Sequence, residues 1–379
     1  MRLFDAERTR QIEGLVCAID DARWRDTPEW HALDLMRGVV GLGLCASAIE
    51  RVFPERGLAD RVLVRAVELF NEGGGGPSLH SGIAGLGLWV ASNYDEPALL
   101  ESIDLALIDH LSRGSVVVSL RAGLAGLAVY AGARAASPSG RELGDVVARM
   151  LAERATTFAD GIAWQTPAAY ARARGVDVIA EPIFETGVCH GQAGILAGLG
   201  ALAQAGHDRA AALVAPALDW LWAAAQPPCT GYSWLRFGVA PDERVEQLHP
   251  NTWCTGEPGI ARAAWLAARA VDHAGHTGRA LELARHVAER ILAGVPAGFA
   301  HRHDLCCGGA SVGHVLHRFF EDTGEPRFRD AASAVLTRLH LPVVESFQFG
   351  RTGVLAALLT ACTDIELDWD VGFGMALPR

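Results

Sequence analysis

The chain has 379 residues, half of them hydrophobic, and a formal net charge of −11 at pH 7. This size allows a large buried core, while the acidic balance argues against a nucleic-acid or anionic-membrane partner. We see no secretory signal at the N-terminus and no apolar run of the ~18 residues that a transmembrane helix needs. Eight cysteines in a chain of this length then indicate reduced thiols and a cytoplasmic location.

A short phrase recurs along the chain: a glycine, a second small residue three positions later, and then an apolar run. The first copy is "MRGVVGLGL" and the last is "QFGRTGVLA". Self-similarity at intervals of 41 to 68 residues is typical of a repeat architecture in which each unit is a helix pair. The seven repeat glycines are Gly38, Gly82, Gly123, Gly191, Gly256, Gly308 and Gly350.

The segments between the phrases are amphipathic. Residues 58–73, 140–155 and 278–294 carry apolar residues at helical spacing with arginines and acids opposite, which predicts outer helices. The segments after the repeat glycines, such as 194–206, are small and apolar, which predicts inner helices buried all round. We therefore predict an all-α fold, an α/α toroid of seven inner and seven outer helices, as a single domain over residues 1–379. The periodicity fits an open α-solenoid equally.

Two long intervals contain material outside the repeat. Residues 161–187 and 226–251 are rich in proline, glycine and aromatic residues. We predict loops with short strands here rather than separate domains. In a toroid these loops lie at the end where the inner helices begin, which is where a site would be built.

Side chains that bind metals cluster one and two residues before the repeat glycines. Repeats four to six carry Cys189 and His190, then Cys254, then Cys306 and Cys307 at these positions. In a closed ring equivalent positions converge on one axis, so these side chains are expected to meet. Adjacent cysteines can bind one ion if they lie on the turn entering a helix, whereas within a helix they would diverge by about 100°.

The phrases "GVCHGQAG", "WCTGEPGIA" and "DLCCGGASVG", in this order and within seven repeats, resemble the lanthionine synthetase C-like cyclases along essentially the whole chain. In that family two cysteines and a histidine, from a Trp-Cys-x-Gly phrase and a Cys-His-Gly phrase, bind one zinc ion. The resemblance implies a zinc site of Cys254, Cys306 and Cys307. Cys307 then stands in place of the usual histidine, as in a branch of the family with three cysteines.

The chemistry that the resemblance implies is Michael addition of a peptide cysteine thiol to dehydroalanine or dehydrobutyrine, which closes a lanthionine or methyllanthionine ring. Zinc deprotonates a thiol whose free pKa is about 8.5, and three protein ligands leave the fourth tetrahedral position open. Three thiolates give the site a formal charge of −1, so a bound substrate thiolate should be more nucleophilic than at a Cys₂His site. His190 is the expected general acid for the enolate.

Other cysteines and histidines are expected to have lesser roles. The family counterpart of Cys189 is usually not a ligand, so we interpret Cys189 as a core residue beside the site. His301 and His303 are expected to line its entrance, on one side of an extended segment. His314 and His317 are interpreted as an incidental i, i+3 pair on a helix. The remaining cysteines are expected to fill the core: Cys17, Cys45, Cys229 and Cys362.

Two positions depart from the family pattern. The family often carries an aspartate four residues before the third repeat glycine, where this chain has Ser119. It often carries an arginine four residues before the Trp-Cys cysteine, where this chain has Pro250. Both family residues are associated with protonation around the zinc, so the acid–base assignment stays open. Arg121, His249 and Asn251 are nearby in sequence and are candidates to replace them.

Three functions fit the sequence. The first is a stand-alone zinc cyclase acting on the leader and core of a precursor peptide that a separate dehydratase has dehydrated, since the chain has no room for a dehydratase domain. The second is a zinc enzyme that adds another thiol, such as glutathione, to dehydrated residues. The third is a non-catalytic, zinc-stabilised scaffold that binds peptides.

Overall fold

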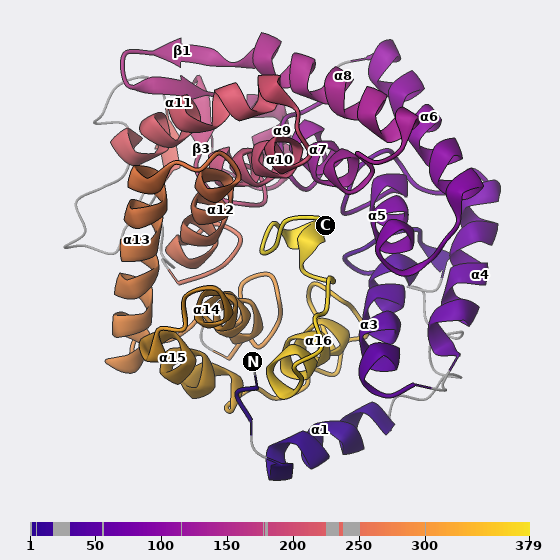
Figure 1. Cartoon of the computed structure of the whole chain (residues 1–379), viewed down its shortest axis with the longest axis vertical. Coiled ribbons are helices and arrows are strands. Elements are labelled where there is room, and N and C mark those ends of the chain that lie inside the picture. Colours follow the sequence, from indigo (N-terminus) through magenta and orange to yellow (C-terminus); the bar gives the residue numbers. More distant parts are fainter. Residues whose placement is uncertain are drawn as a thin grey trace. The chain divides into compact units, whose positions relative to one another are not determined.

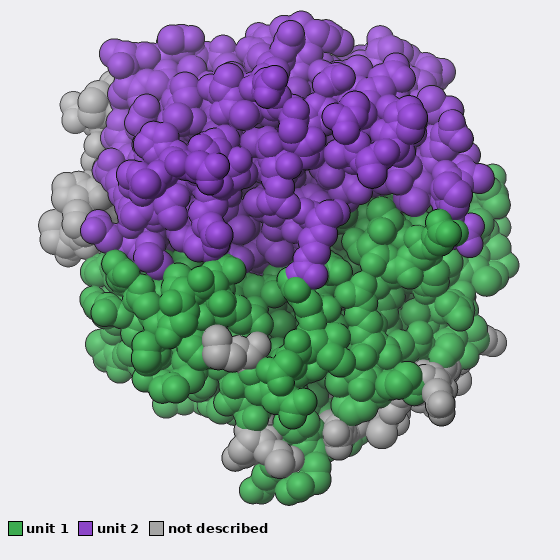
Figure 2. Space-filling view, viewed as in Figure 1, with its two compact units in different colours: residues 1–95, 284–370 green, residues 96–283, 371–379 purple. Residues whose placement is uncertain are grey.

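The computed structural model describes residues 2–4, 6–17, 31–54, 57–114, 116–176, 178, 181–224, 235–237, 251–299 and 301–379. The chain divides into two compact units, each made of two stretches of sequence. Unit 1 comprises residues 1–95 and 284–370, and unit 2 comprises residues 96–283 and 371–379 (Figure 2). The single domain expected over residues 1–379 stays a prediction. In the described part, no helix has the length and apolarity to cross a membrane.

In the described part of the chain, seven helices begin directly after a repeat glycine and are almost wholly buried. We call them the buried helices, and they confirm the segments predicted as inner helices. In unit 1 they are α3 (Val39–Val52), α5 (Ile83–Asn93), α14 (Gly309–Thr323) and α16 (Arg351–Cys362), and in unit 2 they are α7 (Leu124–Ala133), α10 (Gln192–Gln204) and α12 (Glu257–Ala270).

The remaining long helices bury one face only. In α4 (Leu58–Asn71), Leu58, Val62, Ala66 and Leu69 are buried while Arg61 is exposed, as the spacing of apolar residues in this segment predicts. The others are α1 (Ala6–Cys17) and α15 (Pro326–Leu336) in unit 1, α6 (Pro97–Arg113), α8 (Pro138–Arg154) and α11 (Asp208–Ala224) in unit 2, and α13 (Ala274–Leu292), which contributes residues to both. The predicted outer segments therefore form helices.

The glycines of the phrase are required because the chain turns back on itself before each buried helix. A Cβ atom on Gly191 would overlap the carbonyl oxygen of Glu185, six residues earlier. A Cβ on Gly194, the second small residue of that phrase, would overlap the carbonyl oxygen of Val188. The φ of Gly191 is −123°, which any residue can adopt, so the close approach alone excludes a side chain. The recurring phrase is thus the sequence signal for this turn.

Backbone hydrogen bonds join the turns of successive repeats in unit 2. The Arg121 amide donates to the carbonyl of Cys189 (3.1 Å), and the amides of Val188 and Cys189 donate to the carbonyl of Cys254 (2.9 and 3.2 Å). The carbonyl acceptor is in each case the residue two positions before a repeat glycine. The positions that carry Arg121, Cys189, His190 and Cys254 are therefore held side by side.

Unit 1 contains the same links, and there they join the end of the chain to its beginning. The amides of Leu305 and Cys306 donate to the carbonyl of Gln348 (both 3.1 Å), and the Gln348 amide donates to the carbonyl of Met36 (2.9 Å). The seventh repeat thus lies beside the first, with α16 next to α3 and α1 packed on α16 (Figure 1). An open α-solenoid would separate its first and last repeats, so this contact excludes it.

The first interval outside the repeat forms short strands and one short helix in unit 2. β1 (Thr156–Phe158) and β2 (Gly161–Ala163) pair as an antiparallel hairpin, and α9 (Ala168–Ala173) follows. β3 (Ile183–Glu185) then pairs antiparallel with β4 (Leu235–Phe237). The prediction of loops with short strands is confirmed for residues 161–187. Apart from β4 and residue 251, the interval 226–251 lies outside the described residues.

Candidate active site

Cys306 and Cys307 lie on the turn that enters α14, in unit 1. The carboxylate oxygen Oδ1 of Asp304 accepts hydrogen bonds from the amides of both cysteines, each at 2.9 Å, and the helix begins after Gly308. Their Sγ atoms are 3.4 Å apart, and both residues are half-buried. This local geometry has the form required for two adjacent cysteines to reach one ion.

The thiol pair fits a zinc ion in chemistry and in spacing. Zinc binds thiolate sulfur at about 2.3 Å in a tetrahedron, which sets two ligand sulfur atoms roughly 3.8 Å apart. The observed separation of 3.4 Å between the thiols of Cys306 and Cys307 is close to this value. Neither cysteine is in a disulfide, so both sulfur atoms can act as ligands.

Cys254 lies on the corresponding turn of unit 2, directly before α12. Its carbonyl is fixed by the hydrogen bonds from the fourth repeat, and its side chain is almost fully buried. The Sγ atom lies 3.9 Å from Oγ1 of Thr252 and 3.8 Å from Oγ1 of Thr255. The indole of Trp253 donates to the carbonyl of Phe373 (3.1 Å), which anchors the turn. The thiol therefore has hydroxyl neighbours at hydrogen-bonding range for sulfur.

His190 is half-buried and is joined to a tyrosine that the sequence analysis did not identify. Nδ1 of His190 lies 3.0 Å from the hydroxyl of Tyr170, and this hydroxyl lies 3.1 Å from Oγ of Ser119. The Ser119 hydroxyl in turn accepts from the amide of Ala122 (3.1 Å). His190, Tyr170 and Ser119 line a small pocket together with Thr166. The departure from the family pattern at Ser119 is thus accompanied by a tyrosine that contacts both Ser119 and His190.

An ion pair holds Tyr170 in place. Arg174, one turn further along the chain, lies with its guanidinium carbon 4.7 Å from the centre of the Tyr170 ring, an arrangement favoured by the ring's electrostatics. It also donates to the buried carboxylate of Glu185 (2.6 Å). Burial raises the pKa of the Tyr170 hydroxyl, against the opposing effects of the Ser119 hydrogen bond and of the Arg174 and Arg121 cations. The hydroxyl therefore stays protonated at neutral pH.

The signal for Tyr170 in the sequence is faint. Pro167 is the N-cap of α9 and Arg174 its C-cap, and Tyr170 and Arg174 are four residues apart, about one helical turn. The segment lies outside the repeat, so no periodic position identifies the tyrosine as a neighbour of His190.

The other predicted site residues divide between the units. Cys189 is buried, and its amide donates to the carbonyl of Cys254. The cation of Arg121 interacts electrostatically with Tyr170 and opposes the rise in its pKa that burial causes. In unit 1, His303 lines a pocket with His301, Arg302 and Phe299, and the Phe299 amide donates to the carbonyl of Cys307 (2.9 Å). Burial and then His340 lower the pKa of His303. His249 and Pro250 lie outside the described residues.

Two of the cysteines that were expected to fill the core do so. Cys45 is fully buried in α3, and burial raises the pKa of its thiol to about 12. Cys362 is buried in α16. Cys17 ends α1, and Cys229 lies outside the described residues. A buried thiol with a raised pKa is unreactive, which separates Cys45 from the half-buried pair at the α14 turn.

Comparison with known proteins identifies the family. The model of the "Lanthionine synthetase C-like protein" family matches residues 29–353, and the chain belongs to this family. Among solved structures, "Nisin cyclase" matches with a TM-score of 0.74 and 15% sequence identity, over 98% of this chain and 98% of that chain. The likeness shows the fold, an α/α toroid, as predicted from the repeats. No curated protein matches the chain by sequence.

Proposed function

We propose that the chain is a zinc-dependent peptide cyclase that forms lanthionine or methyllanthionine rings. The observation that carries this proposal is the pair of thiols on the α14 turn, oriented together by Asp304, in a member of the lanthionine synthetase C-like family. A structural role alone would not require two adjacent, half-buried thiols held on one turn. The fold of nisin cyclase supports the same function.

Cys254, Cys306 and Cys307 would hold the zinc ion, each offering one sulfur atom. Bound zinc supplies a Lewis acid that keeps the thiol of the substrate cysteine deprotonated at neutral pH. Asp304 orients two of the ligands through their backbone amides, and the hydroxyls of Thr252 and Thr255 flank the third. The thiol of the substrate cysteine would be the remaining ligand.

His190 would give the proton that completes the addition. The thiolate sulfur attacks the terminal carbon of the dehydrated residue, the carbon–sulfur bond forms, and the electron pair of the double bond passes into the enolate. The α-carbon then takes a proton from Nε2 of His190, whose Nδ1 is held by Tyr170. A correctly placed general acid typically accelerates such a step about 10²–10⁴-fold.

The substrate would be a precursor peptide that already contains dehydroalanine or dehydrobutyrine. A separate dehydratase must therefore act before this chain, and we propose that both proteins act in the cytoplasm. The substrate cysteine lies in the same peptide, so the product is a ring and not an adduct.

The test uses the purified full-length chain with a synthetic peptide that carries one dehydroalanine and one cysteine. Cyclisation leaves the mass unchanged, so ring formation is measured by loss of thiol alkylation and by tandem mass spectrometry. We expect about one zinc per chain and rapid ring formation. Cys306→Ala should lose both, whereas Cys362→Ala, which removes a buried core thiol, should keep both.

Two results would favour one of the alternative functions over the cyclase. Transfer of glutathione to the dehydrated peptide, without ring closure, would identify an enzyme that joins a separate thiol. Peptide binding with bound zinc and no new thioether would identify a scaffold. Full zinc content and full cyclisation in Cys306→Ala would remove the proposed ligand set.

A further inference from the structure

The hydrogen bonds around Tyr170 have a preferred direction. The Ala122 amide donates to Oγ of Ser119, and this oxygen lies 3.1 Å from the Tyr170 hydroxyl. If Ser119 donates its own proton to Tyr170, the Tyr170 proton is directed to Nδ1 of His190, 3.0 Å away. In the reverse direction, the Ser119 proton has no acceptor among the described residues. In the forward direction, the hydroxyl protons of Ser119 and Tyr170 both have an acceptor.

This direction determines which nitrogen of His190 carries the proton. Nδ1 accepts from Tyr170, so in the neutral ring the proton resides on Nε2. The ring edge that donates is then the one directed away from Tyr170. A carboxylate at position 119 would do the opposite, because it only accepts: it would take the proton of Tyr170 and leave the tyrosine oxygen to accept from Nδ1.

The surroundings of Tyr170 suit a proton donor that is held rigidly. Its ring centre lies 5.7 Å from that of His190, in an edge-on contact. Arg174 stacks on the tyrosine ring and is fixed by Glu185. Burial raises the pKa of the Tyr170 hydroxyl, while the cations of Arg174 and Arg121 act in the opposite direction and stabilise negative charge on its oxygen. These cations partly offset the cost of the buried phenolate while the phenol has given up its proton.

We propose, resting on the function proposed above, that Tyr170 is a positioning residue that holds His190 as the Nε2–H tautomer and supplies a proton to Nδ1. As Nε2 gives its proton to the α-carbon of the enolate, a carbon–hydrogen bond forms and the Nε2–H bond breaks. Nδ1 takes the Tyr170 proton in the same step, and the negative charge moves from the enolate to the phenolate. The phenolate regains a proton equivalent to the one that the substrate thiol released, so the cycle is balanced.

Ring nitrogen spectra of His190 test the tautomer without any substrate. In protein labelled with ¹⁵N-histidine, comparison with His190→Gln assigns the His190 signals among the 14 histidines. We expect the Nε2–H tautomer in the native chain and in Ser119→Ala. Ser119→Asp should shift the ring to Nδ1–H, and Tyr170→Phe should give a mixture. A native ring in the Nδ1–H form, or a ring unchanged by Tyr170→Phe, would overturn the proposal.

Single-turnover cyclisation tests the proton transfer. Tyr170→Phe should slow ring formation, by roughly 10–100-fold if the loss resembles that of the partner behind a metal-ligating histidine, with zinc content unchanged. The matched control is Tyr130→Phe, which removes a buried hydroxyl that donates to Asp104 (2.6 Å) in the same unit; it should alter neither the rate nor the His190 tautomer. Equal rates for Tyr170→Phe and the native chain would overturn the relay. If the native chain forms no ring, the cyclase proposal fails while the spectra still decide the tautomer.

Discussion

Each unit contains a histidine whose ring is held by a hydrogen bond, and the partners are opposite in kind. In unit 1, Nε2 of His314 lies 2.7 Å from the carboxylate of Asp370, which can only accept. In unit 2, Nδ1 of His190 lies 3.0 Å from the hydroxyl of Tyr170, which donates in the direction proposed above. The carboxylate of Asp370 fixes a proton on Nε2 of His314, the nitrogen that faces it. The phenol of Tyr170 instead fixes the proton of His190 on Nε2, the nitrogen on the opposite side of the ring. The partner therefore determines whether the outward nitrogen can act as a donor.

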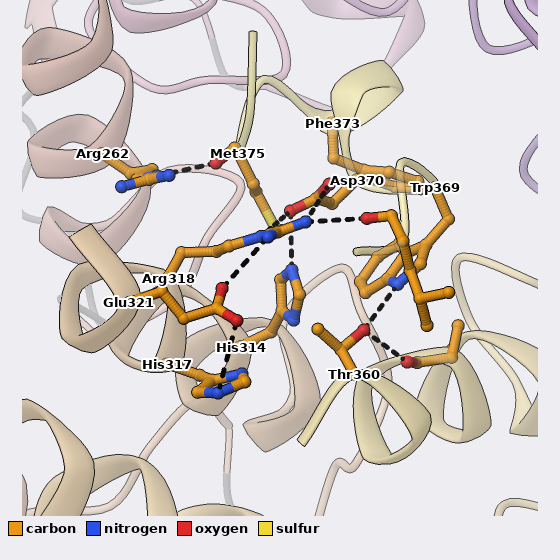
Figure 3. Close-up of polar contacts among 12 residues, drawn as sticks. Arg262, His314, His317, Arg318, Glu321, Thr360, Trp369, Asp370, Phe373 and Met375 are labelled. Atoms are coloured by element: carbon orange, nitrogen blue, oxygen red, sulfur yellow. Dashed lines mark hydrogen bonds and ion pairs between the residues drawn. The ribbon is translucent and has the colours of Figure 1, made fainter. Parts of the chain in front are cut away.

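The two histidines also differ in burial and in their neighbouring charges. Arg318 donates to both oxygens of Asp370 (2.7 and 3.0 Å), and all three side chains are buried (Figure 3). Burial alone would raise the pKa of Asp370, yet the Arg318 cation and the His314 hydrogen bond hold it well below its usual range. Burial lowers the pKa of His314. This network stabilises the fold, while half-buried His190 borders a pocket.

The largest expected effect comes from replacing His190, the histidine of unit 2. His190→Asn should keep zinc and the folded state while the rate of ring closure falls about 10²–10⁴-fold, because the general acid is lost. His314→Asn is the mirror control: it should lower the melting temperature and leave turnover of the folded protein unchanged. Zinc content, thermal unfolding and single-turnover assays on both variants measure this. Normal zinc with near-native turnover in His190→Asn would exclude His190 as the acid.

Asp370→Asn breaks the unit 1 network and should cost about 3–5 kcal/mol in the free energy of unfolding. Removing one partner of a buried ion pair is strongly destabilising, and here it leaves the buried Arg318 cation dependent on the partly exposed Glu321 (3.0 Å). Asp368→Asn is the matched control, since its partly exposed contact with Arg51 (3.0 Å) should contribute less than about 1 kcal/mol. Denaturant unfolding at pH 7 distinguishes them. Equal losses in the two variants would contradict the structural role assigned to Asp370.

The sequence predicted the parts of the molecule that depend on a repeated local constraint. Each buried helix was located from the glycine phrase, which cannot vary freely because a side chain at Gly191 and at most of its counterparts would overlap a carbonyl oxygen six residues earlier. The adjacent cysteines were located on the helix-entering turn for the same reason. Tyr170 was missed because its neighbours are 51 residues before it and 20 residues after it, in a segment without a period. His314 was interpreted as incidental because its partner, Asp370, is 56 residues away.

Acid should weaken the unit 1 network, because protonation of Asp370 removes its ion pair with Arg318. The pKa of Asp370 is lower in the folded chain than its unfolded value of about 3.9. Its stabilising contribution is therefore complete well above pH 4 and is lost as the pH falls toward the folded pKa. In that window the native chain should lose about 1.4 kcal/mol per pH unit from this group, and Asp370→Asn should not. Unfolding curves from pH 6 to pH 3 measure the difference, and a constant gap between the two proteins would contradict it.

The smallest expected effect adds a third kind of histidine to the comparison, one that serves as a metal ligand. Cys307→His replaces a thiolate on the α14 turn with a neutral imidazole, the commoner family ligand, so zinc should be retained. The site loses one negative charge, which lowers the pKa of a bound substrate thiol and with it the thiolate's nucleophilicity. With a Brønsted slope of about 0.4–0.5, each unit of lowered pKa should slow the attack about threefold. The measurement is single-turnover cyclisation under saturating peptide, with zinc content determined on the same sample. Equal or faster ring closure with full zinc would show that the charge of the ligand at position 307 does not control the nucleophilicity of the substrate thiolate.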